Sequence, residues 1–307
     1  MGLQGKWRIL LTGATGFVGQ AVVKGLLANG HQCFVLSRNP EHAGRMFPAG
    51  VTLLRYDSQW PAVQGVIHLA GESIVGLWTA EKRRRIMASR VQGTRQLVNW
   101  IAGLESRPEV LLSMSAVGVY GDRPGETLTE SAVPDPLHKF RAKVCLAWEA
   151  EANQAARLGV RVVNLRLGNV LHPSGGYLGK LLGLYRWLPI VAMGNPQAML
   201  SWISLEDAGR LIEFALSQPQ ISGPLNLTAP NPVSQAQFFQ ILAQSLGRRV
   251  YGRLPIWLMR LGMGSFADAF LDWQDVRPGT AQTHHFPFTR PNLEIYLQQL
   301  FAQSQNL

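Results

Sequence analysis

A glycine-rich segment near the N-terminus carries the residues best suited to chemistry. Residues 12–19, Thr-Gly-Ala-Thr-Gly-Phe-Val-Gly, lie between an apolar run at residues 8–11 and an amphipathic stretch typical of a helix. Gly13 permits a tight turn, Gly16 lets the backbone approach a pyrophosphate, and Gly19 allows helix and strand to pack closely. The free N–H groups of the helix then point at the anion. The segment predicts a dinucleotide site with contacts from Gly13, Thr15, Gly16, Phe17, Val18 and Gly19.

The end of the second expected strand bears on the choice between the two nicotinamide cofactors. An acidic residue there would hydrogen-bond the adenosine ribose of NAD and repel a 2′-phosphate. This chain has Ser37 and Arg38 instead, a hydroxyl donor and a permanent cation. We therefore expect NADP(H), with NAD(H) the weaker candidate; the alternative is that Arg38 is an ordinary surface residue. Asp57, after the third strand, is expected either to accept from the adenine amine or to cap a turn.

Alternating strands and helices must position this segment. Strands are expected at residues 8–11, 33–37, 51–55, 66–69, 110–115 and 160–167, and helices at 16–29, 79–104, 140–158, 205–216 and 234–246. The alternation predicts an α/β fold with a Rossmann-type, doubly wound parallel sheet. Beyond Leu171 the pattern loosens and Pro and Gly become frequent. We expect residues 1–171 to form an NADP-binding Rossmann domain, to which some later segments return, and residues 172–307 to form mainly a smaller C-terminal substrate lobe.

Composition narrows the classes of partner. The chain has 307 residues, 47% of them hydrophobic, and a formal charge of +10. Its basic residues are dispersed except at residues 82–85, and no basic stripe is interleaved with aromatic residues, so we expect no nucleic-acid partner. Cys33 and Cys145 lack metal-ligand spacing and are expected to be reduced and structural, with no metal bound. No apolar run is long enough to span a bilayer, so we expect a cytoplasmic protein without a membrane partner.

Several segments along the chain carry a family resemblance. They are residues 12–19, 69–72, 89–94, 115–121, 148–149, 202–203 with Asp207, and 223–232. Together they make the chain similar to the epimerase-family proteins related to bacterial YfcH, an atypical branch of the extended short-chain dehydrogenases/reductases in the NAD-dependent epimerase/dehydratase superfamily. The similarity covers nearly the whole chain. It implies cofactor contacts at Ser37, Arg38, Leu69, Ala70, Gly71 and Arg90, and a homodimer formed through the helices at residues 79–104 and 140–158.

One departure from the family pattern concerns its proton-transfer pair. The family chemistry uses a Tyr four residues before a Lys on the helix after the fifth strand, the Lys lowering the pKa of the phenol. Aligning that helix by its start places Phe140 and Val144 at these positions, whereas aligning it on Lys143 places Lys139 at the Tyr position. Neither alignment restores a phenol. If hydride transfer occurs, another group must serve as the acid or base.

Candidate replacements come from the strand ends and from the helix start. Ser115 matches the serine with which the family orients its substrate, and Tyr120 is a candidate acid; the alternatives are a strand-end serine and a core tyrosine. Asn169 is the expected substrate contact. Lys139, Arg141 and Lys143 are expected to be solvated or to hold a substrate phosphate, His138 to lie at the surface, Glu72 and Glu149 to be structural, and Asp207 to cap a helix. An apolar cluster of Trp257, Leu258, Met259, Leu261, Met263, Phe266 and Phe270 is expected to pack in the core, with a substrate wall or partner surface as the alternative.

Two classes of function follow. In the first, the protein is an NADP(H)-dependent oxidoreductase or epimerase acting on a carbonyl or hydroxyl of a small, nucleotide-sugar-like substrate. In the second, the cofactor is kept as a structural or sensing ligand, and the protein is a non-catalytic regulator or interaction protein, for example in cell division. The glycine turn, Ser115 and the substrate lobe favour the enzyme, while the missing Tyr-Lys pair favours the regulator.

Overall fold

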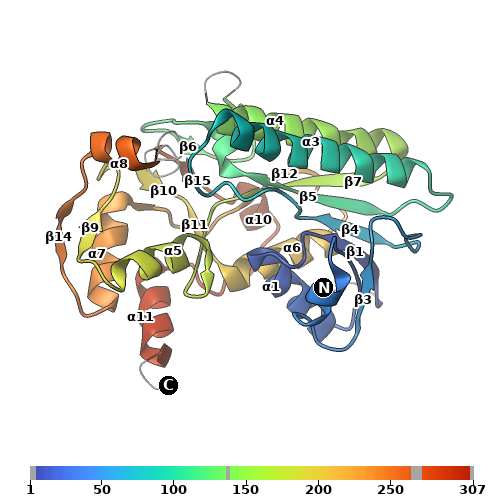
Figure 1. Ribbon diagram of the computed structural model, residues 1–307, viewed down its shortest axis with the longest axis horizontal. Helices are drawn as coiled ribbons and strands as arrows, with labels where there is room; N and C mark the ends of the chain where they lie inside the picture. Colours follow the sequence, from blue (N-terminus) through green and yellow to red (C-terminus); the bar gives the residue numbers. More distant parts are fainter. Residues whose placement is uncertain (1–4, 136–138, 264–271, 305–307) are drawn as a thin grey trace.

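A seven-stranded parallel sheet organises the computed structural model, which describes residues 5–135, 139–263 and 272–304. From one edge to the other its strands are β3 (Val51–Leu54), β2 (Gln32–Leu36), β1 (Arg8–Thr12), β4 (Gly65–His68), β5 (Val110–Ala116), β7 (Arg161–Leu167) and β12 (Gly223–Leu227). Each neighbouring pair is parallel. The first six strands follow the doubly wound order 3-2-1-4-5-6. The predicted Rossmann-type α/β fold is therefore confirmed (Figure 1).

Helices cover both faces of this sheet, as the apolar strands require. Helices α3 (Ala80–Ala102) and α4 (Phe140–Asn153) lie on one face, and α1 (Phe17–Ala28) and α6 (Leu205–Ser217) lie on the other (Figure 1). Alternate residues of β1 serve the two sides: Leu10 packs in a cluster with Leu97 and Ile101 of α3, whereas Ile9 and Leu11 pack in a cluster with residues of α1 and α6. The sheet is thus buried on both faces, and its strand ends are the parts left open for a ligand.

The ends of the helices match the sequence with one exception. Thr79 caps α3, its hydroxyl accepting a hydrogen bond from the Lys82 N–H. The helix predicted over residues 140–158 is split, because α4 ends at Asn153 and the chain continues as the 3₁₀ helix η2 (Gln154–Leu158). Gly159, with φ +81°, ends that turn in the left-handed conformation and redirects the chain into β7.

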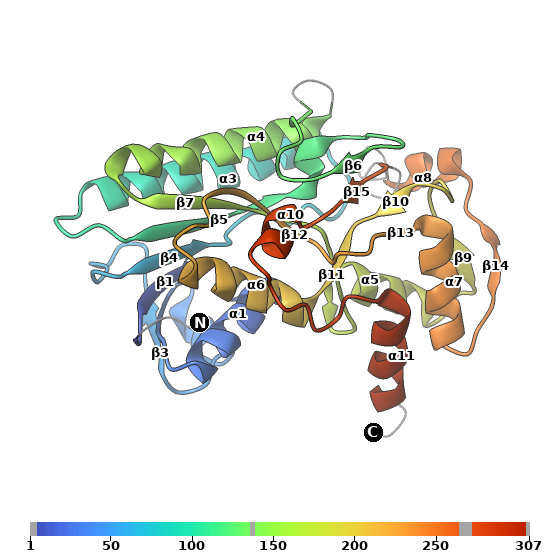
Figure 2. The ribbon, with the colours of Figure 1, turned by 180° about the vertical axis from the view of Figure 1, so that it is seen from behind.

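Much of the chain after β7 forms a second layer of structure with its own core. Three two-stranded sheets pair β8 (Asn169–His172) with β11 (Trp202–Ser204), β9 (Ile190–Ala192) with β14 (Val250–Arg253), and β10 (Met199–Leu200) with β13 (Val233–Ser234). Around them lie α5 (Gly176–Tyr185), α7 (Gln235–Ser245), α8 (Ile256–Met263) and α11 (Leu293–Ser304). The shorter elements are α2 (Pro40–Gly44), η1 (Val117–Tyr120), α10 (Gly279–Thr283), and β6 (Thr127–Leu128), which pairs with β15 (Asp275–Val276). Strand β12 and helix α6 leave this region and complete the large sheet (Figure 2).

Two expectations for the C-terminal half were wrong. The start of α6 is capped by Ser204, whose hydroxyl accepts from the Asp207 N–H. The buried Asp207 carboxylate instead accepts hydrogen bonds from the backbone N–H groups of Thr289 and Arg290, and so ties the C-terminal segment to α6. The second wrong expectation is that the apolar cluster at and after α8 packs in the core.

Of that apolar cluster only one described side chain is in the core. Met259 is buried, whereas Trp257, Leu258 and Leu261 are exposed. Phe266, Phe270 and the Met263 side chain lie outside the described residues. In the described ranges, no helix is long and apolar enough to cross a membrane.

Candidate functional site

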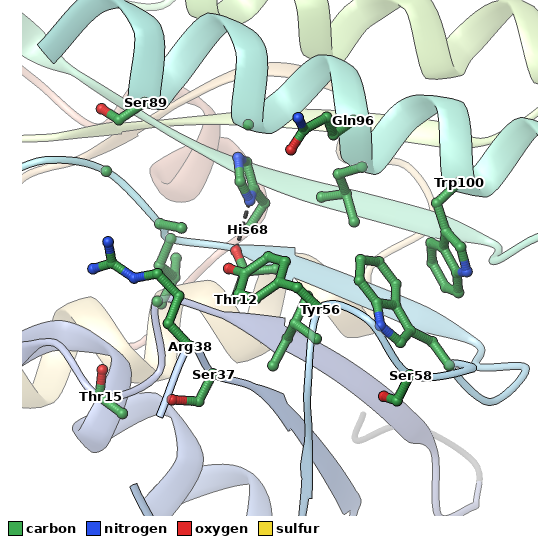
Figure 3. Close-up of a pocket in the computed structure, with 18 of the residues that line it drawn as sticks. Thr12, Thr15, Ser37, Arg38, Tyr56, Ser58, His68, Ser89, Gln96 and Trp100 are labelled. Atoms are coloured by element: carbon green, nitrogen blue, oxygen red, sulfur yellow. Dashed lines mark hydrogen bonds between the residues drawn. The ribbon is translucent and has the colours of Figure 1, made fainter. Parts of the chain in front are cut away.

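A cavity of about 1100 Å³ opens at the carboxyl ends of β1, β2 and β4. The strand order runs outward in opposite directions from β1 and β4, and such a switch point is where doubly wound sheets bind ligands. The lining includes Thr12, Gly13, Thr15, Gly16, Ser37, Arg38, Tyr56, Trp60, His68, Leu69, Ala70, Gly71, Ser89, Gln96 and Trp100. Figure 3 shows Thr12, Ser37 and His68 at the strand ends facing Ser89, Gln96 and Trp100 of α3.

The glycine turn forms one wall of the cavity and needs glycine at two places. Gly13 has φ +70° and lies so close to the end of β4 that a Cβ would sit 2.6 Å from the Ala70 nitrogen. A Cβ on Gly19 would sit 2.5 Å from the Gly13 carbonyl oxygen, so this glycine lets α1 approach the turn. Gly16 is the N-cap of α1, and its N–H donates to the Gly13 carbonyl at 3.0 Å. The turn therefore has the close-packed shape, and the helix start, that a pyrophosphate requires.

The predicted contacts of this turn divide into two groups. Gly13, Thr15 and Gly16 line the cavity. Among the described residues that line it, Phe17, Val18 and Gly19 are not included. The Phe17 ring lies against Gly175 and Gly176, where it packs α1 against the start of α5. These three residues position the turn from behind.

A cation without an ion-pair partner among the described residues lines the cavity. Arg38 is exposed, lines the cavity, and makes no hydrogen bond or ion pair with any residue that the structure describes. The Ser37 hydroxyl accepts from the Asn39 N–H at 3.1 Å. Burial raises the pKa of the neighbouring Tyr56, and the positive charge of Arg38 partly opposes that rise. An unpaired guanidinium beside a hydroxyl is a suitable site for a phosphate.

Asp57 is placed differently from its neighbours. Its carboxylate pairs with the Arg55 guanidinium, at 3.1 Å, and its side chain is largely exposed. It is not among the described residues that line the cavity, although Tyr56 and Ser58 on either side of it are. The geometry therefore does not support the expectation that Asp57 accepts a hydrogen bond from an adenine amine in the cavity.

Aromatic residues that the sequence analysis did not select form the opposite wall. The rings of Trp60 and Trp100 lie 4.8 Å apart, and Tyr56 meets Trp60 edge to face at 6.1 Å. Tyr56 lies between Arg38 and Trp100 (Figure 3). Flat apolar rings are suited to hold a base next to a phosphate site. The available signal was two aromatic residues, Tyr56 and Trp60, in the polar segment after the third strand.

His68 forms the floor of the cavity and was also missed. Its Nδ1 is 2.6 Å from the Thr12 hydroxyl and its Nε2 is 2.9 Å from the Thr94 hydroxyl, so it joins β1, β4 and α3. The ring is buried, and burial lowers its pKa to about 4. His68 is therefore neutral at physiological pH and acts as a structural link under the cofactor turn. A histidine at the carboxyl end of a central strand was the signal in the sequence.

We expect His68 to make the protein sensitive to mild acid. Because its pKa falls from 6.5 in the unfolded chain to about 4 in the folded state, the unfolded state binds more protons between these values. The contribution of His68 to the free energy of unfolding is therefore fully present above pH 6.5. About 3 kcal/mol of it is lost as the pH falls to about 4. Urea unfolding across this window should show the loss in the wild type and a flatter slope in His68→Gln. An equal slope in both proteins would contradict the assignment.

The segment after β4 is held from behind by Arg90. Leu69, Ala70 and Gly71 line the cavity. Arg90 Nη1 donates to the Glu72 carbonyl at 3.1 Å, and its guanidinium lies 4.9 Å from the centre of the Trp148 ring. Arg90 is not among the described lining residues, so it braces the cavity floor from outside.

Ser115 and Tyr120 belong to a buried polar network. Ser115 Oγ donates to Glu149 Oε1 at 2.6 Å, and Arg166 donates to both Glu149 oxygens at 3.0 and 2.9 Å. Arg166 Nη1 also donates to the Tyr120 hydroxyl at 2.9 Å, which in turn donates to Asn226 at 2.8 Å. Tyr120 is 0% exposed, and burial raises the pKa of its phenol. Among the described residues, neither Ser115 nor Tyr120 is part of the cavity lining.

The helix positions expected for the missing Tyr-Lys pair are apolar. Phe140 and Val144 pack with Trp78 and Ile86, and the Phe140 and Trp78 rings meet at 5.4 Å. This cluster leaves no titratable group at either position of that alignment.

Two of the basic residues at that helix start pair with a carboxylate from the C-terminal half of the chain. Lys139 and Arg141 both form ion pairs with the buried Asp272, which reduces the charge available for a substrate phosphate. Lys143 is exposed, and His138 lies outside the described residues. Asn169 begins β8, and its amide donates to the Ser201 carbonyl at 3.0 Å; it is not among the described residues that line the cavity.

Comparisons with known proteins agree with this geometry. The sequence pattern of the NAD dependent epimerase/dehydratase family matches residues 9–227. The chain is 33% identical to the epimerase family protein YfhF of Bacillus subtilis over 97% of this chain and 99% of that protein. It is 35% identical to the chloroplastic epimerase family protein SDR39U1 homolog of Arabidopsis thaliana over 91% of this chain and 82% of that protein. The human epimerase family protein SDR39U1, solved with NADPH, superposes with a TM-score of 0.86 at 27% identity, covering 98% of this chain and 100% of that one.

Proposed function

The chain belongs to the NAD dependent epimerase/dehydratase family, and we propose that within it this protein is a cytoplasmic NADP(H)-dependent oxidoreductase or epimerase-like enzyme. The observation that carries the cofactor proposal is Arg38, whose side chain makes no ion pair with a described residue and which lines the same cavity as the glycine turn. A 2′-phosphate would supply the negatively charged partner that the Arg38 guanidinium does not have among the described residues. The NADPH in the human relative supports the same choice.

The residues of the cavity fit a dinucleotide. The glycine turn and the start of α1 would hold the pyrophosphate, Ser37 and Arg38 the 2′-phosphate, and Tyr56 with Trp60 the adenine side. When bound, the nicotinamide accepts or supplies a hydride. Leu69, Ala70 and Gly71 would shape the cofactor surface between these ends.

We propose a small, nucleotide-sugar-like substrate with a carbonyl or hydroxyl group, bound beyond the carboxyl ends of the strands. Asn169 is the proposed substrate contact, and Ser115 and Tyr120 remain the proposed groups for orientation and proton transfer. The raised pKa of Tyr120 keeps its phenol protonated, as an acid must be. Its burial requires the substrate to reach it through a rearrangement near η1.

Replacing Arg38 with Ala should weaken NADPH binding by about 10- to 100-fold, because one charge-assisted interaction with the phosphate is lost. NADH binding should be unchanged. The measurement is titration of the purified protein with each cofactor, followed by the fluorescence of its nine tryptophans. Arg45→Ala is the matched control, since Arg45 is an exposed arginine outside the described cavity lining. Equal weakening of both cofactors, or of neither, would remove Arg38 as the selectivity residue.

A second candidate function is that of a cofactor-binding regulator without turnover. The apolar Phe140–Val144 cluster favours it, because the helix lacks the proton-transfer pair at these positions. The two functions differ in one observable. Oxidation of NADPH in the presence of a carbonyl substrate supports the enzyme, whereas tight NADPH binding without turnover, together with a protein partner, supports the regulator.

A further inference from the structure

A second concentration of unusual side chains lies far from the cavity, at the end of the molecule formed by β9, β14 and α8 (Figures 1 and 2). Large apolar side chains are exposed to solvent there. Trp187 is 81% exposed, Tyr251 71%, Trp257 67% and Leu261 76%. Further exposed apolar residues at this end are Leu184, Leu188, Val250, Ile256 and Leu258. We call this set, with the arginines described next, the distal surface.

Cations alternate with these apolar residues. The distal surface includes Arg186, Arg248, Arg249, Arg253 and Arg260. The segments that build it contain no acidic residue: none occurs at positions 152–205 or 214–267 of the sequence. In the described parts of these segments the charged side chains are therefore all basic, in contrast to Lys139 and Arg141, which share Asp272.

The arginines have different roles within this surface. Arg248 is structural, because it donates to the carbonyl groups of Tyr185 and Leu188 and so joins the loop after α5 to the start of β14. The Arg186 guanidinium lies over the Trp187 ring, 5.2 Å from its centre. The side chains of Arg249 and Arg253 are exposed and make no hydrogen bond or ion pair with a residue that the structure describes. A hollow of about 470 Å³ opens between residues 186–189 and 247–251.

We infer that the distal surface binds the surface of an anionic lipid bilayer. Exposed tryptophan and tyrosine rings are suited to the headgroup level, leucine and isoleucine to the edge of the acyl chains, and unpaired arginines to lipid phosphates. Such binding requires no spanning helix, so it is compatible with the lack of one in the described ranges. It revises the expectation of no membrane partner, which rested only on the length of apolar runs.

The exposed aliphatic residues favour a lipid bilayer over a nucleic acid as the partner of the distal surface. Single-stranded nucleic acids bind basic surfaces through stacking on aromatic rings, which makes no use of aliphatic side chains. Here five aliphatic side chains of the same segments are exposed as well, namely Leu184, Leu188, Ile256, Leu258 and Leu261. Hydrocarbon contact gives these five residues a role, because it removes their apolar area from water.

The test is cosedimentation of the full chain with phosphatidylcholine vesicles, alone or with one third phosphatidylglycerol. We expect binding to the anionic vesicles only, and weaker binding as salt increases. The double variant Arg249→Glu/Arg253→Glu should lower the partition coefficient by at least about tenfold. Trp187→Ser/Tyr251→Ser should also lower it, with the salt dependence kept, because these changes remove apolar anchors and no charge.

Lys24→Glu/Arg157→Glu is the matched control, since it makes the same change in net charge at exposed positions on α1 and η2. It should bind vesicles like the wild type, and all variants should keep their cofactor affinity, which shows that they are folded. Equal loss in the control, equal binding to neutral and anionic vesicles, or no binding at all would overturn the proposal. So would displacement from vesicles by single-stranded RNA, or a change from dimer to monomer in the distal variants with no vesicle binding.

Discussion

Replacing Glu149 with Ala should lower the free energy of unfolding by about 3–5 kcal/mol, because it leaves the Arg166 charge buried without a counter-charge. Arg166 and Glu149 are 4% and 7% exposed, and two hydrogen bonds join them at 3.0 and 2.9 Å. The Ser115 hydroxyl would lose its acceptor in the same change. Urea unfolding monitored by tryptophan fluorescence measures the effect.

Two further proteins show whether burial is the cause. Glu151→Ala removes a carboxylate of the same helix whose partner, Arg95, is largely exposed, and should cost less than about 1 kcal/mol. The double variant Glu149→Leu/Arg166→Met should be more stable than Glu149→Ala, since no unpaired charge remains. A loss below about 1 kcal/mol in Glu149→Ala itself would contradict a buried ion pair.

Replacing Gly13 with Ala should reduce NADPH affinity by at least about a hundredfold, or about 2.7 kcal/mol. The added Cβ would lie 2.6 Å from the Ala70 nitrogen and from the Leu69 carbonyl carbon, so the end of β4 must move. That segment lines the cavity, and its displacement changes the cofactor surface directly. The left-handed backbone, φ +70°, adds about 1–2 kcal/mol of strain to the folded state. Cofactor titration and thermal unfolding measure the two effects separately.

Gly125→Ala separates strain from collision. Gly125 has a similar φ, +77°, but an added Cβ there meets no atom within 4 Å. We expect a stability loss of about 1 kcal/mol from strain and no change in cofactor affinity. If Gly13→Ala binds NADPH as well as Gly125→Ala does, the close contact with β4 is not what the turn requires.

The cofactor end of the cavity could be predicted because its determinants are local in sequence. Gly13, Gly16 and Gly19 lie within one turn and helix start, and their conformations follow from chain geometry. Ser37 and Arg38 follow a strand whose apolar run is evident in the sequence. The alternation of strands and helices gave the sheet for the same reason, since each period is read from neighbouring residues.

The surroundings of the candidate catalytic residues could not be predicted in this way. The Tyr120 hydroxyl donates to Asn226, 106 residues later, and Ser115 donates to Glu149 on another element. The exposure of Trp257 and Leu261 was missed because amphipathic spacing shows that one face is apolar, without showing whether another element covers it. Asp207 was read as a cap because its partners, at residues 289–290, lie far along the chain.

The position of β12 has a consequence for how the protein is made. Six strands of the large sheet lie within residues 8–167, but the seventh is Gly223–Leu227, and α6 comes just before it. During translation the nascent chain therefore carries an open edge on β7, and a sheet face covered by α1 alone, until these segments have left the ribosome. Such an edge is a template for pairing with another chain. The folding of the cofactor-binding half thus depends on α6 and β12, which are made after residue 204, and this half cannot complete its own sheet when it is cut after Leu171.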